Sequence, residues 1–375
     1  MAGIYIHIPF CKQRCTYCDF YTQVAPQKIP EIVTSIVSEL HLRKDYLKNQ
    51  QVDTIYFGGG TPSLLNYLQF KSIFNAIFDT YNVDKDAEIT FEANPDDLSP
   101  AFLNDVMKLP FNRISIGIQS FDDEFLKKIN RRHSGLQAIK AVQECKRHGI
   151  NNISVDLIYG LPGQTMENWS KELETAYGLD VQHISVYGLT YEQGTRLWKQ
   201  REMGTVQVVD EDVMIEMYDL MLQKMNEKGF EAYEISNFAL PGYRSCHNSA
   251  YWKMNPYLGV GPSAHSFDGN SRQWNIASNT KYINAIKNGV IPFEKEVLNV
   301  NDRYNDYVMV SLRTADGIDI DFIEKQFGTE FSDYCIINST PFINSDKMIQ
   351  SQKILKLSKE GIQISNLIIS ELMKV

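Results

Sequence analysis

Three of the six cysteines in this 375-residue chain, Cys11, Cys15 and Cys18, lie within eight residues of one another. Their spacing places three thiolates on one short loop. Three thiolates can bind three irons of a [4Fe-4S] cube and leave the fourth iron open. The amino and carboxylate groups of S-adenosylmethionine can chelate an open iron, and a reduced cluster can then release a 5′-deoxyadenosyl radical. The loop therefore predicts a [4Fe-4S] cluster with S-adenosylmethionine as its second cofactor.

Zinc and a disulfide are the alternative explanations of these cysteines. A structural zinc site needs four protein ligands, so His7 or a distant cysteine would have to complete it, and the chain has no second C-x-x-C pair. Three clustered cysteines cannot pair evenly in disulfides, and the N-terminus has no secretory signal pattern. The number of ligands therefore favours the iron–sulfur cluster.

The elements that must position this loop alternate regularly between strand and helix. Strands are expected at residues 3–8, 54–57, 88–92, 113–118, 152–158 and 183–187. Helices with apolar residues at helical spacing are expected between them. This alternation over about 190 residues indicates right-handed βαβ units and a parallel sheet. We expect an α/β fold, in which a doubly wound open sheet fits the pattern almost as well as a curled one.

Polar and glycine-rich residues follow the expected strands, at the edge of the sheet that carries the active site in barrel-type folds. Gly59, Gly60 and Thr61 follow the second strand, where glycine permits close backbone approach to a ligand. Glu92, Gln119 and Asp156 are expected at the ends of strands three, four and five, and Arg131 can bind a carboxylate. Tyr5 and Tyr17 flank the cysteines and are candidates either for cofactor contact or for packing.

A second group of candidates lies outside the expected sheet. His247, Tyr251 and Trp252 fall close together in one segment. A neutral imidazole is a good axial ligand for haem iron, and the two aromatic rings can cover a porphyrin face. A core histidine beside core aromatic residues explains the same spacing equally well.

Composition and charge limit the class of protein. Hydrophobic residues make up 43% of the chain and charged residues 22%, as in ordinary globular proteins. The net charge of −9 argues against a nucleic-acid surface, and no apolar run is long enough to span a bilayer. The absence of a signal peptide and the need for reduced thiols predict a cytoplasmic protein.

Three parts are expected along the chain: the sheet domain over 1–236, a loop-rich connecting segment over 237–300, and a small α+β domain over 301–375. In the last part, helices are followed by a possible hairpin at 354–357 and 361–364, which is similar to a winged helix. Because it has eight basic and eleven acidic residues, we interpret it as a structural or docking module rather than a DNA-binding one.

Together these motifs resemble one branch of the radical S-adenosylmethionine superfamily, which contains the oxygen-independent coproporphyrinogen III oxidases and the HemW-type haem chaperones. The resemblance covers nearly the whole chain and implies a six-stranded partial (β/α)6 barrel. It also implies that Cys11, Cys15 and Cys18 are the cluster ligands. The remaining motif matches imply contacts to the cluster-bound S-adenosylmethionine at Tyr5, Gly59 and Glu92. Gly60, Thr61, Gln119, Arg131 and Asp156 resemble residues that contact a second S-adenosylmethionine in the oxidase branch.

Three departures from the oxidase pattern favour the chaperones. Phe20 stands where the oxidases have a fourth cysteine, and Cys11 is close to the N-terminus, without the oxidase extension. The segment from His247 to Trp252 is similar to the haem-binding signature of the chaperones. The resemblance therefore implies a protein that binds haem, receives electrons from a donor protein and passes haem to an acceptor protein. The alternative is oxidative decarboxylation of coproporphyrinogen III.

Overall fold

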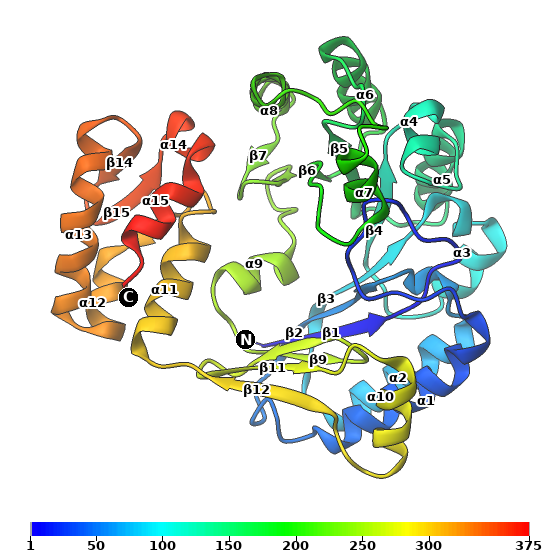
Figure 1. Ribbon diagram of the computed structural model, residues 1–375. Coiled ribbons are helices and arrows are strands. Elements are labelled where there is room, and N and C mark those ends of the chain that lie inside the picture. The colour runs from blue at the N-terminus through cyan, green and yellow to red at the C-terminus, as the bar shows by residue number, and fades with distance from the viewer. Residues whose placement is uncertain (1, 375) are drawn as a thin grey trace.

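A computed structural model describes residues 2–374, and its centre is a curved sheet with six consecutive parallel strands (Figure 1). These strands are β1 (Ala2–Ile8), β2 (Val52–Gly59), β3 (Val83–Ala93), β4 (Arg113–Gln119), β5 (Ile153–Tyr159) and β6 (His183–Gly188). Each pairs in parallel with the next. The prediction of an α/β fold with a six-stranded parallel partial barrel is thus confirmed.

Helices cover the outer face of the sheet, as the alternation of residue types along each strand requires. On β1, for example, Ile4, Ile6 and Ile8 are fully buried in the main hydrophobic core, which they share with the covering helices. The covering helices are α1 (Ile29–Leu42), α2 (Tyr67–Thr80), α3 (Pro100–Val106), α4 (Asp123–Lys128), α5 (Gly135–Arg147), α6 (Met166–Gly178) and α8 (Glu211–Glu227). Tyr5 and His7 alternate with these isoleucines and face the polar interior, so the barrel interior is the place for chemistry.

Residues 237–300 are not the loop-rich connection that the sequence suggested. This segment contains β8 (Asn237–Ala239), α9 (Cys246–Trp252), β9 (Tyr257–Val260), β10 (His265–Phe267), β11 (Ser271–Asn275), α10 (Asn279–Lys287) and β12 (Phe293–Val297). The strands extend the sheet at both ends: β8 pairs with β6 and β9 pairs with β1. With β7 (Glu231–Ala232), the sheet has twelve strands. Pro241 and Gly242 lie in the turn between β8 and α9, and Gly261 and Pro262 lie in the turn between β9 and β10.

A buried carboxylate ties this extension to the barrel. Glu39 on α1 forms a 2.9 Å ion pair with Arg43 and accepts a 2.5 Å hydrogen bond from the Tyr282 hydroxyl. It also accepts hydrogen bonds from Gly261 N and Asn275 Nδ2. A buried charge is stable only when it is paired and hydrogen-bonded, and Glu39 is both.

The C-terminal part has its own hydrophobic core and a small antiparallel sheet. Its elements are α11 (Val300–Ser311), β13 (Ile318–Asp319), α12 (Ile320–Phe327), α13 (Thr329–Asn344), β14 (Met348–Ser351), β15 (Ile354–Leu357), α14 (Lys359–Gln363) and α15 (Ser365–Leu372). The predicted hairpin is half wrong, because β15 pairs with β14 and residues 361–363 are helical. Ser358 caps that turn by accepting from Gly361 N, which ends the strand. Within residues 2–374, no helix is both long and apolar enough to cross a membrane.

Candidate functional site

The cysteine loop leaves the carboxyl end of β1 and is closed at its base by backbone hydrogen bonds. Cys11 N donates to Gln23 O at 3.1 Å, and Gln23 N donates to Pro9 O at 2.9 Å. Thr16 N donates to Ile129 O at 3.1 Å, which anchors the middle of the loop to the segment after α4. The three thiols are free and partly exposed. The loop is therefore held at the mouth of the barrel with its cysteines accessible.

Two side chains donate hydrogen bonds to the cysteine sulfurs, Thr61 from the turn after β2 and Arg131 from the segment after α4. The Thr61 hydroxyl lies 3.4 Å from Cys11 Sγ, and Arg131 Nη1 lies 3.5 Å from Cys15 Sγ. Burial raises the pKa of the Cys11 thiol and raises that of Cys18 to about 11. Metal binding at these cysteines must therefore release protons.

The glycines after β2 make room for the cysteine loop itself. Gly59 has φ = +100°, and a Cβ there would lie 2.4 Å from the His7 ring. A Cβ on Gly60 would lie 2.5 Å from Phe10 O, and Gly60 N donates to Ile8 O at 2.9 Å. Gly59 has a left-handed conformation and lies against the His7 ring, and Gly60 lies too close to the Phe10 backbone to carry a side chain. Because Gly59 and Gly60 have no side chains, the base of the cysteine loop can pack directly against the end of β2.

Glu92 faces the barrel interior near the end of β3. It accepts a 2.8 Å hydrogen bond from the Tyr56 hydroxyl. Burial raises the pKa of its carboxyl to about 7, with a further upward contribution from Asp156. Burial likewise raises the pKa of Asp156, which accepts from Ser115 at 3.1 Å. Asp156 lies in the middle of β5 rather than at its end.

Arg131 connects the remaining predicted residues at the barrel mouth. Its Nη2 donates to Asn94 Oδ1 at 2.7 Å and also to Gly117 O. The Gln119 amide lies beside it, since a Cβ on Gly117 would meet Gln119 Nε2 at 3.0 Å and Arg131 Nη2 at 3.3 Å. Gln119 has φ = +70°, a conformation that is uncommon for residues with a side chain.

The two tyrosines have different surroundings. Tyr5 faces the interior, where its hydroxyl lies 3.2 Å from His7 Nδ1 and its ring lies beside Tyr56. Tyr17 packs against a small apolar cluster at the cysteine loop that includes Ile129 and Leu197. Burial raises the pKa of both hydroxyls, so both stay protonated at neutral pH.

Sequence reasoning missed Asn94 as a member of this group. Asn94 follows β3 directly, and its two amide atoms bridge Arg131 and Thr61, donating to Thr61 Oγ1 at 3.1 Å. Its position immediately after a strand was the available signal. Asn94 therefore aligns the two side chains that donate to the cysteine sulfurs.

His247 lies at the other end of the barrel. It is only 2% exposed, and its ring stacks on Tyr56 with centroids 5.0 Å apart. Nδ1 lies 2.8 Å from Thr54 Oγ1 and Nε2 lies 2.9 Å from the Tyr251 hydroxyl. Burial lowers the pKa of His247 to about 3, so the ring is neutral. Both ring nitrogens of His247 therefore already have hydrogen-bond partners. Trp252, at the end of α9, is partly buried.

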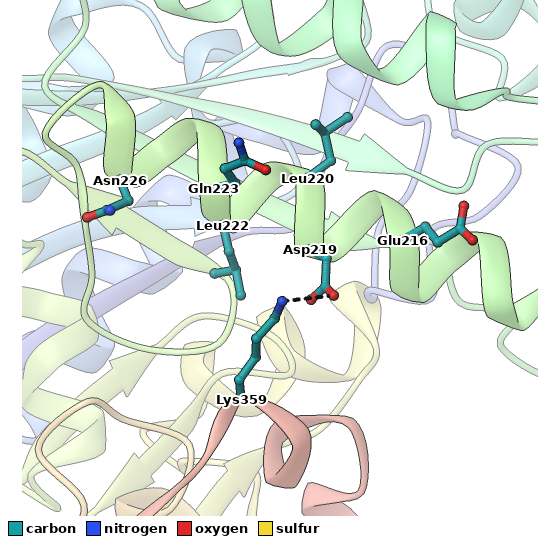
Figure 2. A pocket seen from close by; sticks show the side chains of 7 residues that line it. All are labelled: Glu216, Asp219, Leu220, Leu222, Gln223, Asn226 and Lys359. Carbon is teal, nitrogen blue, oxygen red and sulfur yellow. Dashed lines mark ion pairs between the residues drawn. The ribbon is translucent and has the colours of Figure 1, made fainter.

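Two cavities have different chemistry. One of about 650 Å³ is lined by Cys15, Cys18 and residues of α7 (Arg196–Glu202) and the loop before it. The other, of about 570 Å³, lies between α8 and α14. There Asp219 and Lys359 point toward each other and form a 3.0 Å ion pair (Figure 2). The second cavity thus lies where the barrel and the C-terminal part meet.

Comparison with known proteins identifies the family. The chain matches the Radical SAM superfamily over residues 5–176 and the HemN C-terminal domain over residues 298–364. It is 32% identical to the heme chaperone HemW of Lactococcus lactis over 367 residues, which cover 96% of this chain and 94% of the relative. The heme chaperone HemW of Bacillus subtilis is 33% identical over 331 residues, which cover 88% of this chain and 87% of that one. The chain belongs to the HemW family of radical SAM proteins.

A solved structure shares the fold of this HemW-family chain. Coproporphyrinogen III oxidase (HemN) from Escherichia coli, a radical SAM enzyme, superimposes with a TM-score of 0.87 at 21% identity. The similarity covers 100% of this chain and 90% of the other. At this identity the comparison establishes the fold and not the reaction.

Membership in the radical SAM superfamily implies a [4Fe-4S] cluster and S-adenosylmethionine, and the donor set of this HemW-family chain fits them. No group of three or more His, Cys, Asp or Glu side chains in residues 2–374 converges as ligands of a single metal ion. A cube does not require such convergence, because each cysteine binds a different iron. Cys11, Cys15 and Cys18 would each bind one iron of such a cube, and the fourth iron would stay open for a cofactor.

Proposed function

We propose that this protein is a haem chaperone of the radical SAM type, which binds haem and transfers it to an acceptor protein. The proposal is supported by the similarity to HemW proteins along nearly the whole chain. Cys11, Cys15 and Cys18 are the proposed cluster ligands. When bound, the cluster supplies an electron that can cleave the sulfonium of S-adenosylmethionine.

The observation that carries the cofactor part of the proposal is the pair of hydrogen bonds from Thr61 and Arg131 to the cysteine sulfurs. These donors would stabilise the thiolates of a loaded cluster. Arg131, a cation at the same mouth, would bind the carboxylate of S-adenosylmethionine. The proposed cofactor contacts are Tyr5, Tyr17, Gly59, Gly60, Thr61, Glu92, Gln119, Arg131 and Asp156.

For haem, we propose the α9 segment with His247, Tyr251 and Trp252. In the structure His247 is buried and both ring nitrogens are hydrogen-bonded. Binding of haem iron by His247 therefore requires the bond to Thr54 or the bond to Tyr251 to break. We propose that α9 leaves its position at the barrel end when haem binds. A cytoplasmic location, an electron-donor protein and a haem acceptor protein complete the proposal.

Two anaerobic measurements test this function. Haem titration of the reconstituted protein should give a saturable Soret band, and haem should then pass to an apo-haemoprotein acceptor. Incubation with coproporphyrinogen III, reductant and S-adenosylmethionine should give no decarboxylated product. Decarboxylation without haem binding would replace the chaperone by an oxidase. If neither occurs, the function is neither of the two.

A further inference from the structure

The cavity beside Cys15 and Cys18 has a strongly basic lining. Arg14 lies on the cysteine loop, and Arg196 and Lys199 lie on α7. Asp19 is the only acidic residue of the lining, and Glu192 is exposed in the segment before α7. In a chain with a net charge of −9, three cations beside the proposed cluster ligands are a local concentration of positive charge.

These cations are free to bind a partner. The part of the chain that the structure describes contains no ion pair of Arg14, Arg196 or Lys199. Exposed cations elsewhere are often paired, as Lys171 is with Glu167 and Lys127 with Glu124. Arg14 donates only to the backbone, at 3.5 Å from Cys18 O.

Helix α7 is fixed relative to the cysteine loop. Leu197 N donates to Thr16 O at 2.8 Å, and the Leu197 side chain is fully buried in the apolar cluster that also contains Ile129. The Thr195 side chain caps α7 by accepting from Trp198 N at 3.1 Å. The cations on α7 therefore keep a constant position beside Cys15 and Cys18.

The loop that carries the cysteines also presents apolar side chains. Phe20 is 63% exposed and Val24 is 60% exposed, although the residues between them have polar contacts within the fold. Protein interfaces combine such apolar contacts with charged groups at the rim, and the charges mainly accelerate association. Arg14, Phe20 and Val24 all lie on the cysteine loop, so this loop carries both an unpaired cation and exposed apolar side chains.

We propose that the basic face formed by Arg14, Arg196 and Lys199 is the docking surface for an acidic one-electron carrier protein with a flavin or iron–sulfur group. The proposal rests on the proposed cluster at Cys11, Cys15 and Cys18. The reduced carrier loses one electron and the oxidised cluster gains one, so no bond is made or broken in this step. An acidic partner fits because its carboxylates would pair with the unpaired cations that lie beside the proposed cluster.

The test compares charge-reversal variants in two assays. Arg196→Glu combined with Lys199→Glu is compared with Lys140→Glu combined with Lys281→Glu, which changes the net charge equally on α5 and α10. Binding of an oxidised flavodoxin, a small acidic flavoprotein, is measured with the protein before cluster loading. Reduction of the loaded cluster by hydroquinone flavodoxin is followed by stopped-flow absorbance and by the paramagnetic signal of the reduced cluster.

We expect the α7 variant to associate on the order of tenfold more slowly at low ionic strength, and the control variant to match wild type. The wild-type rate should fall as salt is added, whereas the variant rate should not fall, because its reversed charges repel an acidic partner and salt screens that repulsion. Equal affinities and rates for wild type and both variants would overturn the docking surface. The association rate of the neutral variant Arg196→Gln with Lys199→Gln should lie between those of wild type and the charge-reversed variant. This graded response would distinguish an effect of charge from structural damage to α7.

Dithionite reduction separates this proposal from the proposed function. Dithionite needs no docking surface, so it should reduce wild type and both variants to the same extent. If the chain assembles no cluster that dithionite can reduce, the proposed function fails. If dithionite reduces the cluster and flavodoxin does not distinguish the variants, only the docking surface fails.

Discussion

Thr54 on β2 and His247 on α9 are 193 residues apart in the chain, and their side chains meet at 2.8 Å inside the barrel. Glu88 on β3 adds to this contact by accepting from the backbone N–H groups of Cys246 and His247 at 2.9 Å. A carboxylate at a helix N-terminus satisfies free amides and favours the helix dipole. The segment proposed for haem is therefore held in place by two barrel strands, through Thr54 near the start of β2 and Glu88 in the middle of β3.

The cluster ligands can be tested by iron loading. Cys15→Ser should lose most of the iron and the broad visible absorbance after anaerobic reconstitution, because only two thiolates remain. Wild type should load about four irons per chain. Cys246→Ser is a matched control, since Cys246 is also a free thiol but lies on α9. Equal loading of Cys15→Ser and wild type would remove Cys15 from the ligand set.

The carboxyl of Glu92 should control cofactor binding. Glu92→Gln keeps the size of the side chain and its contact with Tyr56 but removes the charge that would bind the ammonium group of S-adenosylmethionine. We expect affinity to fall by about tenfold, as is typical for loss of a charged hydrogen bond. Calorimetric titration of the reconstituted protein with S-adenosylmethionine measures this affinity. Glu124→Gln, on the surface, serves as the control.

The pH dependence of Glu92 follows from its raised pKa. Between its ordinary pKa of 4.5 and the folded value of about 7, the folded protein holds a proton that the unfolded chain has lost. The contribution of Glu92 to the free energy of unfolding therefore falls as pH rises through this window and is constant above it. Glu92→Gln should be more stable than wild type at pH 8, by about 1 kcal/mol or more, and equally stable near pH 4. Urea denaturation at several pH values measures both; a difference that does not vary with pH would contradict the prediction.

Haem coordination can be tested at α9. His247→Ala should shift or abolish the Soret band and leave iron–sulfur loading unchanged, because the cysteines lie at the other end of the strands. It should also lower the free energy of unfolding by about 1–3 kcal/mol, since Thr54 loses its buried partner. An unchanged spectrum and affinity would exclude His247, and Cys246 and His265, both exposed, become the candidates. His265→Ala is the control variant.

The buried carboxylate of Glu39 should be important for stability and not for chemistry. Glu39→Ala leaves Arg43 buried without its charge partner, which costs about 3–5 kcal/mol. Glu31→Ala, also on α1, removes an exposed ion pair with Lys287 of α10 and should cost no more than about 1 kcal/mol. Thermal and urea unfolding measure the stability of the Glu39→Ala and Glu31→Ala variants against wild type. If both variants have similar stability, the buried network is not what joins α1 to the extended sheet.

The sequence was sufficient for the parallel strands because each has a buried outer face. Ile114, Ile116 and Ile118 alternate with polar residues, and this pattern identifies the strand without knowledge of its neighbours. Helix starts carry equally local signals: Ser99 followed by Pro100 caps α3, and Ser134 caps α5. Local signals of this kind do not depend on contacts between distant segments.

The sequence was insufficient where distant contacts decide. The strands β9 and β10 have only four and three residues, too short to show an alternating pattern, and they form through pairing with β1 and β11. The burial of His247 was likewise hidden, because Thr54 and Tyr56 come from a segment nearly 200 residues earlier. The spacing of His247, Tyr251 and Trp252 is equally compatible with a core histidine and with an iron ligand. Asn94 was missed since its role depends on Arg131, which reaches it from the segment after α4.

The position of β1 has a consequence for how the protein is made. This strand pairs with β2 on one side and with β9 on the other, so one of its edges has no partner until residues 257–260 have left the ribosome. Until then the nascent chain presents an open strand edge, which is prone to pair with other chains. The cysteine loop begins at the end of this same strand. The loop can reach its final geometry only late in synthesis, so we expect metal loading to follow translation of β9 rather than accompany emergence of the cysteines.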